Sequence, residues 1–104
     1  AKSFDTFTPL GPYIETKIDP TDMTIQLFQN GQLRQNSHTR QMIFNCYDIV
    51  SFISAQMTLL PGDVILTGTP EGVGLGMKPP QHLKRGDVIT LSGGILGTQQ
   101  QRVR

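Results

Sequence analysis

Hydrophobic and polar residues alternate on both sides of an Asn-Gly pair at positions 30 and 31, and this is the clearest local pattern in the chain. Asn-Gly supplies the two left-handed residues of a type I′ turn, so the pattern predicts a β-hairpin over residues 24–35. The turn also fixes the register, and we expect Phe28 to lie opposite Leu33 on one face of the hairpin. The first predicted element is therefore an antiparallel strand pair.

Four further segments have the composition of β-strands. β-Favouring residues follow a Gly-Pro turn near the start of the chain, and a short apolar run follows a Pro-Gly turn in the middle. An alternating run follows a Gly-Asp pair, and the polar end of the chain is typical of an edge strand. The predicted strands are Tyr13–Lys17, Val64–Leu66, Gly86–Leu91 and Thr98–Val103.

One segment has helical signals. Asn45 followed by Asp48 is typical of a helix N-terminus, in which the first side chain caps the helix and an acid occupies its first turn. Ile49 and Ile53 then begin an apolar stripe, and Pro61-Gly62 predicts the end of the helix. The whole pattern predicts a mainly β domain with one helix, of the α+β class.

The junction after the apolar run at Val64–Leu66 is the best candidate for chemistry. The predicted strand runs directly into a loop that contains Thr67, Gly68 and Thr69. Threonine hydroxyls both donate and accept hydrogen bonds, and glycine allows a ligand to approach the backbone closely. We therefore expect a small-molecule site at this junction.

Composition narrows the class of protein. The chain has 104 residues, a formal net charge of +1 and one cysteine. It has no basic stripe to attract nucleic acid, and Cys46 alone forms neither an internal disulfide nor a cysteine-rich zinc site. No apolar run approaches the ~20 residues that span a bilayer. These features predict a cytoplasmic domain that binds neither nucleic acid nor a membrane.

Two common ligand sites do not fit the motifs. The glycine-rich residues 72–76 follow a strand, as in a nucleotide-binding loop, but Lys78-Pro79-Pro80 prevents the helix that would hold the phosphates. The acidic residues form no Glu-x-Glu pair or calcium loop, and His38 and His82 lie in polar, turn-like segments. We therefore predict that this chain supplies no metal ligand by itself.

The segment Lys2–Pro12, taken together with the loop Thr67–Pro70, resembles the fumarylacetoacetate hydrolase family. The likeness covers essentially the whole chain, and intermediate motifs such as Thr58–Asp63 and Gly72–Gly74 follow in family order. The closing residues from Lys78 onward further resemble the branch of acylpyruvases and diketo-sugar-acid hydrolases.

The resemblance implies a mixed β-sandwich roll, usually dimeric, that binds a divalent metal such as Mg²⁺, Mn²⁺ or Ca²⁺ and acts on 2-oxo acids. In such enzymes a metal-binding Glu-x-Glu and a following Asp lie upstream of the segment that resembles Lys2–Asp5. We therefore interpret residues 1–104 as the C-terminal portion of a single catalytic domain, expect the metal ligands outside this chain, and expect the chain alone to be inactive.

The resemblance also assigns roles to individual residues. Lys2 matches an active-site lysine whose ammonium stabilises enolate or oxyanion charge, and Thr67 matches a threonine that hydrogen-bonds the substrate. Both are predicted catalytic residues, with Thr67, Gly68 and Thr69 predicted to bind substrate. The expected partners are a small 2-oxo acid and a second copy of the protein in a homodimer.

The implied reaction is hydrolysis of a carbon–carbon bond in an acylpyruvate or a 2,4-diketo acid, through a metal-bound enolate, in a catabolic pathway. Two alternatives stay open. One is an isomerase or decarboxylase of 2-oxo dioic acids on the same fold. The other is a non-catalytic β module that binds a partner or supports an oligomer, since the acidic ligands are absent from the sequence.

Overall fold

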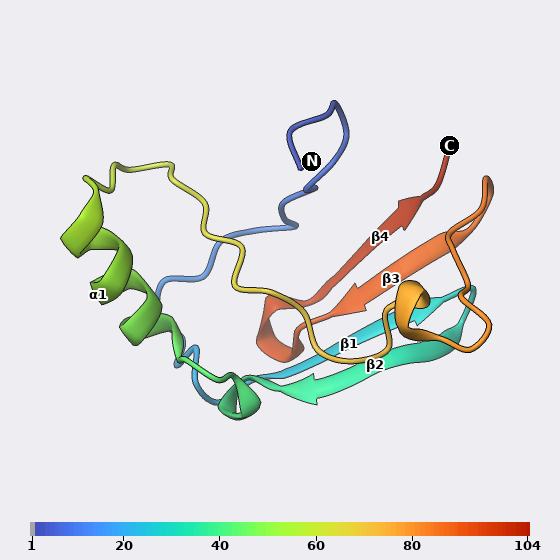
Figure 1. Ribbon diagram of the computed structural model, residues 1–104, viewed down its shortest axis with the longest axis horizontal. Helices are drawn as coiled ribbons and strands as arrows, with labels where there is room; N and C mark the ends of the chain where they lie inside the picture. The colour runs from blue at the N-terminus through green and yellow to red at the C-terminus, as the bar shows by residue number, and fades with distance from the viewer. Residues whose placement is uncertain (1) are drawn as a thin grey trace.

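The computed structural model describes residues 2–104. Its centre is a four-stranded antiparallel sheet in the order β2-β1-β3-β4 (Figure 1). The strands are β1 (Thr24–Gln29), β2 (Gln32–His38), β3 (Val88–Ser92) and β4 (Thr98–Arg102). One α-helix, α1 (Cys46–Gln56), lies in the long connection between β2 and β3. The predicted mainly β fold with one helix is confirmed.

Three short 3₁₀ turns complete the secondary structure. They are η1 (Thr39–Gln41), η2 (Gly74–Gly76) and η3 (Gly94–Leu96). The last of these joins β3 to β4, so the two strands form a second hairpin. The predicted strands at residues 86–91 and 98–103 are confirmed to within two residues at each end.

The first hairpin turns where the sequence predicts. Asn30 and Gly31 have φ values of 51° and 78°, as a type I′ turn requires, and Phe28 pairs with Leu33. Between Phe28 and Leu27 the register shifts by one residue, so that Leu27 pairs with Gln35. This β-bulge moves Gln35 to the same face of the sheet as Leu27, because residues directly opposite one another share a face.

The tip of this hairpin is fastened to the start of β3 by Asp87. The Asp87 carboxylate accepts hydrogen bonds from the side chains of Asn30 (2.9 Å) and Gln29 (2.8 Å) and from the Lys84 backbone N–H (2.9 Å). Asn30 in turn accepts from the Val88 N–H at 2.9 Å. The hydrogen bond from Asn30, followed by those from Lys84 and Gln29, lowers the pKa of Asp87.

Helix α1 begins as predicted and ends earlier than predicted. Asn45 accepts a hydrogen bond from the Asp48 N–H at 3.0 Å, which confirms the N-cap. The helix ends at Gln56, and Met57 already has extended backbone angles. The prediction that Pro61-Gly62 ends it is therefore wrong. Asp63 accepts from the Leu60 N–H at 2.8 Å and so supports a separate turn after the helix.

Two predicted strands do not form. Tyr13–Lys17 and Val64–Leu66 have no ladder partner among residues 2–104. Tyr13 is held by its side chain instead, through a hydrogen bond from its hydroxyl to the Ile95 carbonyl at 2.7 Å. Apolar composition alone predicts that a segment is suited to a sheet, but a strand also needs a neighbour to pair with.

The apolar side chains of the described residues are incompletely covered. None of them is fully buried, and Gln35, with 9% of its surface accessible, is the single buried residue of that part of the chain. The helix also leaves large apolar side chains open to solvent, with Phe52 71% and Tyr47 62% exposed. Within residues 2–104, no helix is both long enough and apolar enough to cross a membrane.

Candidate functional site

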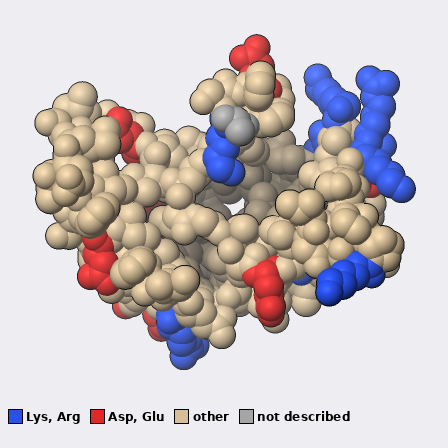
Figure 2. All heavy atoms as spheres, in the orientation of Figure 1, with Lys and Arg blue, Asp and Glu red and all other residues tan. Residues whose placement is uncertain are grey.

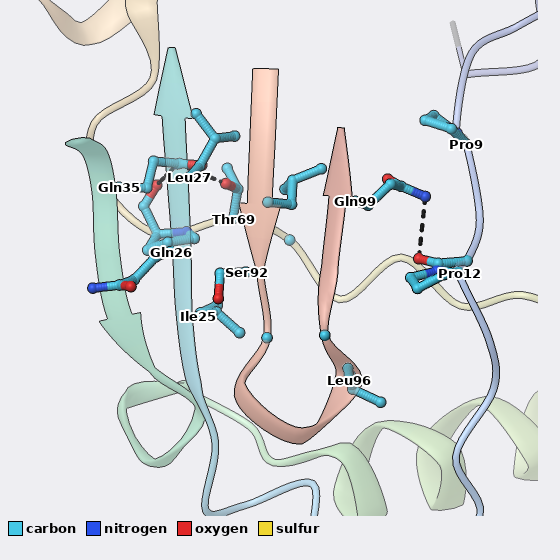
Figure 3. Close-up of a pocket in the computed structure, with 16 residues that line it drawn as sticks. Pro9, Pro12, Ile25, Gln26, Leu27, Gln35, Thr69, Ser92, Leu96 and Gln99 are labelled. Atoms are coloured by element: carbon cyan, nitrogen blue, oxygen red, sulfur yellow. Dashed lines mark hydrogen bonds between the residues drawn. The ribbon is translucent and has the colours of Figure 1, made fainter. Parts of the chain in front are cut away.

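A pocket of about 370 Å³ lies over the middle of the sheet (Figure 3). Its floor includes Ile25 and Leu27 of β1 and Leu91 of β3. One wall is the N-terminal segment at residues 9–12, and another is the loop at residues 68–70. The predicted strand-to-loop junction therefore does border a cavity of a size suited to a small molecule.

Two hydrogen bonds join the N-terminal wall to β4 and to the η3 turn that precedes it. The Gln99 side-chain amide donates to the Gly11 carbonyl at 3.1 Å, as the dashed line beside Pro12 shows in Figure 3. The Tyr13 hydroxyl donates to the Ile95 carbonyl in η3. These two contacts place residues 9–13 beside the β3–β4 hairpin, far from them in sequence.

The loop wall is held against β2 by Gln35. The Gln35 side-chain Nε2 donates to the Thr69 Oγ1 at 2.9 Å, to the Pro70 carbonyl at 2.8 Å and to the Glu71 carbonyl at 3.2 Å. Gly72 follows with a φ of 98°, and a Cβ atom at this position would overlap the Arg34 carbonyl group. The loop therefore approaches β2 as closely as backbone atoms allow.

The structure brings together only some of the predicted site residues. Gly68 and Thr69 line the pocket, whereas Thr67 and Lys2 do not. Lys2 is exposed, and its carbonyl accepts a hydrogen bond from the Thr8 hydroxyl at 3.0 Å. Thr67 is exposed, and its side chain forms no hydrogen bond with the other described residues. The catalytic roles of Lys2 and Thr67 stay predictions.

Sequence patterns do not predict a role for Gln35 at the site. Its position in a polar strand is typical of a solvent-facing residue, and the bulge that turns it inward has no signature in the hydrophobic alternation. Gln35 pairs with Leu27 and lines the pocket, which identifies it as part of the pocket wall.

The pocket has no charged side chain among its lining residues, and its polar groups are hydroxyls, carboxamides and backbone atoms. Figure 2 shows acidic and basic side chains scattered over this face, with mainly uncharged atoms around the central hollow. Such a lining suits a small ligand that is fixed by hydrogen bonds to neutral donors.

The described residues do not fit a metal centre. Among residues 2–104, no three His, Cys, Asp or Glu side chains lie close enough together to hold an ion. His38 is engaged elsewhere, since its Nε2 lies 3.2 Å from the Asp22 carboxylate and its Nδ1 accepts from the Arg40 N–H. A divalent metal at this pocket would need ligands other than these side chains.

The fold and the site define a β domain with one helix and an uncharged pocket that is bordered by a Thr-Gly-Thr-Pro loop. Over residues 1–104 the chain matches the family described as fumarylacetoacetate (FAA) hydrolase C-terminal. The chain belongs to the fumarylacetoacetate hydrolase family. This confirms the resemblance that the sequence motifs indicated.

Two relatives in this family carry different activities in their names. The chain is 46% identical over 106 residues to the 2,4-didehydro-3-deoxy-L-rhamnonate hydrolase of Sphingomonas sp. (strain SKA58), and the match covers 98% of the chain and 37% of that relative. It is 48% identical over 91 residues to the mitochondrial oxaloacetate tautomerase Fahd2a of Rattus norvegicus, covering 85% of the chain and 29% of that protein.

Solved structures agree with the fold. The chain superposes with a TM-score of 0.95 on fumarylacetoacetate hydrolase from Exiguobacterium antarcticum, at 47% identity, covering 99% of the chain and 38% of that structure. It superposes with a TM-score of 0.84 on maleylpyruvate hydrolase from Sphingobium sp. SYK-6 in complex with manganese (II) ion and pyruvate, at 39% identity, covering 96% of the chain and 36% of that structure. In each case the chain spans less than two fifths of the relative's length.

Proposed function

We propose that the chain is the C-terminal part of an enzyme that cleaves a carbon–carbon bond in an acylpyruvate or 2,4-diketo acid. The observation that carries the proposal is that Thr69 lines an uncharged pocket of about 370 Å³ from a loop held against β2. The substrates of this reaction present carbonyl and carboxylate oxygens, which hydroxyl donors recognise. The named hydrolases among the relatives support the same reaction class.

The reaction needs charge stabilisation at one oxygen. Water adds to the distal carbonyl of the diketo acid, the adjacent carbon–carbon bond breaks, and its electron pair passes into a pyruvate enolate. Protonation of the enolate carbon then gives pyruvate and a carboxylic acid. Thr69 would donate a hydrogen bond to the oxygen that gains charge, and each such donor is typically worth about 3 kcal/mol of the barrier.

Lys2 is the proposed source of positive charge at the enolate. An ammonium group near the developing oxyanion lowers the energy of the transition state more than that of the bound substrate, in which the same carbonyl oxygen is still uncharged. Lys2 is exposed and does not line the pocket in the described structure, so the support for its role is the family motif.

The complete enzyme is proposed to use a divalent metal and to form a homodimer. The manganese in the Sphingobium neighbour supports a divalent metal in this family. The family resemblance implies that the ligands are a Glu-x-Glu and an Asp outside this chain, and we propose the same for the complete enzyme. Such a metal would supply Lewis-acid polarisation of a substrate carbonyl. A cytoplasmic location stays a prediction, since the rat relative is named as mitochondrial.

Tautomerisation or isomerisation of a 2-oxo dioic acid is the second candidate. The oxaloacetate tautomerase of Rattus norvegicus is as similar to this chain as the named hydrolases are, with 48% identity. Such a reaction moves a proton between carbon and oxygen and needs the same donor at the enolate oxygen, but it consumes no water. The two candidates therefore differ in their products and not in the role of Thr69.

The products of the full-length protein distinguish the two reactions. With acetylpyruvate and Mn²⁺, carbon–carbon hydrolysis releases pyruvate and acetate in equal amounts. With oxaloacetate, tautomerisation changes the enol absorbance and releases no pyruvate. Activity on oxaloacetate alone would contradict the hydrolase and favour the tautomerase, and activity in neither assay would contradict both.

Four variants of the full-length protein test the proposed donors. Thr69→Val should lower kcat/KM by about 100-fold, the effect of removing one hydrogen bond made to developing charge, whereas Thr69→Ser keeps the hydroxyl and should stay within a few-fold of wild type. Thr67→Val decides between the two threonines, because a comparable loss there would support the catalytic role predicted from the family motif.

Lys2→Ala should cut turnover sharply without changing the thermal unfolding curve, and near-wild-type turnover would rule out its role.

A further inference from the structure

Gln35 is the one buried residue among residues 2–104, and its side chain is polar. A buried carboxamide is costly unless its hydrogen bonds are made. Gln35 meets this condition through the loop that borders the pocket, because its Nε2 lies within 3.2 Å of three oxygens in residues 69–71. Figure 3 shows Gln35 beside Thr69 at the edge of the pocket.

The chemistry of the Gln35 carboxamide determines which group donates in its contact with the Thr69 hydroxyl. A carboxamide nitrogen carries two hydrogens and accepts none, so the three oxygens around Nε2 share two N–H donors and none of them can donate to it. The Pro70 and Glu71 carbonyls accept by nature, whereas the Thr69 hydroxyl has a choice and is here forced to accept at 2.9 Å. Its single proton must therefore point away from Gln35.

That proton has no acceptor among the described residues. Within residues 2–104, Thr69 Oγ1 accepts from Gln35 and donates to no other group, and Thr69 lines the pocket. We infer that Gln35 is a positioning residue that orients the Thr69 hydroxyl as a hydrogen-bond donor toward the pocket, so that the site selects ligands with an acceptor oxygen. The identity of that ligand as a 2-oxo acid rests on the proposed function.

The bulge in β2 explains how a strand residue comes to this position. Without the register shift, Gln35 would pair with Gln26, and it would lie on the other face of the sheet from Leu27. The shift pairs Gln35 with Leu27 and turns its side chain toward the loop. The orientation of Thr69 thus depends on a backbone irregularity in a different element.

A double-mutant cycle on the full-length protein tests this inference, with pyruvate as the probe in the presence of Mn²⁺. Gln35→Met removes the donor at similar volume and leaves the Thr69 hydroxyl free to rotate. We expect pyruvate to bind about fivefold more weakly to Gln35→Met and about tenfold more weakly to Thr69→Val, while Thr69→Ser binds it within about twofold of wild type.

The decisive comparison is made in the Thr69→Val background. If Gln35 acts through the Thr69 hydroxyl, adding Gln35→Met there should change pyruvate affinity by less than about twofold. An equal fivefold loss in both backgrounds, or no loss in either, would overturn the inference. A residue that merely stabilised the loop would produce the same loss in both backgrounds.

Gln35→Asn repeats the measurement if circular dichroism shows that Gln35→Met does not fold, since Asn keeps the carboxamide on a side chain one carbon too short to reach Thr69. Wild-type protein that fails to bind pyruvate would overturn the proposed function and, with it, the substrate-facing role of Gln35. Wild-type protein that binds pyruvate independently of Gln35 would overturn the inference alone.

Discussion

The four-stranded sheet and the segment that contains α1 are held in place by different kinds of contact. In the sheet, residues far apart in sequence hold one another, as when Asp87 fastens the β1–β2 turn to the start of β3. In the α1 segment the hydrogen bonds are local, such as those between Asn45 and Asp48, and the apolar side chains of Tyr47 and Phe52 remain exposed. The sheet is thus specified by contacts within this chain, whereas α1 is specified by its own sequence.

The difference between long-range and local contacts is clearest at two glycines that have nearly the same φ. Gly72, in the loop clamped to β2, and Gly62, after α1, have φ values of 98° and 96°. A Cβ atom on Gly72 would overlap Arg34 of β2, whereas one on Gly62 would meet nothing within 4 Å. We expect Gly72→Ala to lower the free energy of unfolding by about 3 kcal/mol or more and Gly62→Ala by about 1 kcal/mol.

Urea unfolding of the two alanine variants measures this difference. Equal losses would mean that backbone strain alone determines the cost, and that the contact between the loop and β2 contributes nothing. A larger loss for Gly72→Ala would show that the loop is clamped by contacts distant in sequence.

Asp87 is expected to show the next largest effect. Asp87→Ala leaves three donors without their acceptor, and we expect the midpoint of thermal unfolding to fall by about 5 °C or more. Asp5→Ala is a matched control, because the Asp5 side chain forms no hydrogen bond with the other described residues. Similar midpoints for the two variants would contradict the role of Asp87 in joining the hairpins.

The same carboxylate gives the sheet a dependence on pH. Hydrogen bonds lower the pKa of Asp87 below its ordinary 3.8, and hydrogen bonds from Thr21 do the same for Asp19. A group with a lowered pKa contributes stability that is fully present above 3.8 and is lost as the pH falls through the lowered value. We expect wild type to lose stability below about pH 4, and Asp87→Ala to lose less over the same range. Parallel curves from melts between pH 7 and pH 2.5 would contradict this.

The smallest effect is expected on α1. Phe52→Gln changes a side chain that is 71% exposed and should alter the free energy of unfolding of the 104-residue chain by less than about 0.5 kcal/mol. Leu27→Gln, at a half-buried position in β1, should cost about 1 to 2 kcal/mol. Comparable costs in chemical denaturation would show that α1 packs within this chain after all.

The elements that local sequence determines were predictable. Asn30-Gly31 fixed the hairpin turn and the Phe28–Leu33 pair, and Asn45 fixed the start of α1. The predicted strands at residues 13–17 and 64–66 failed for one reason, which is that pairing depends on a neighbouring strand that local composition does not reveal.

The pocket lining was predictable only in part, since Lys2 and Thr67 were also predicted at the site and do not line the pocket. The Thr-Gly-Thr-Pro motif located Gly68 and Thr69 at the pocket, because glycine and threonine beside an apolar segment are typical of ligand loops. Gln35 could not be predicted, since its inward position follows from a one-residue register shift. The shift changes which face every later residue of β2 occupies, and it leaves no trace in the spacing of apolar residues.

A crystal structure of the full-length protein with Mn²⁺ and pyruvate would show directly whether Thr69 binds the ligand. We expect pyruvate in the pocket between residues 9–12 and 68–70, with an oxygen within hydrogen-bond distance of the Thr69 hydroxyl and Gln35 still donating to that hydroxyl. Pyruvate bound elsewhere, or a Thr69 hydroxyl that donates to a protein carbonyl while pyruvate is bound, would contradict it.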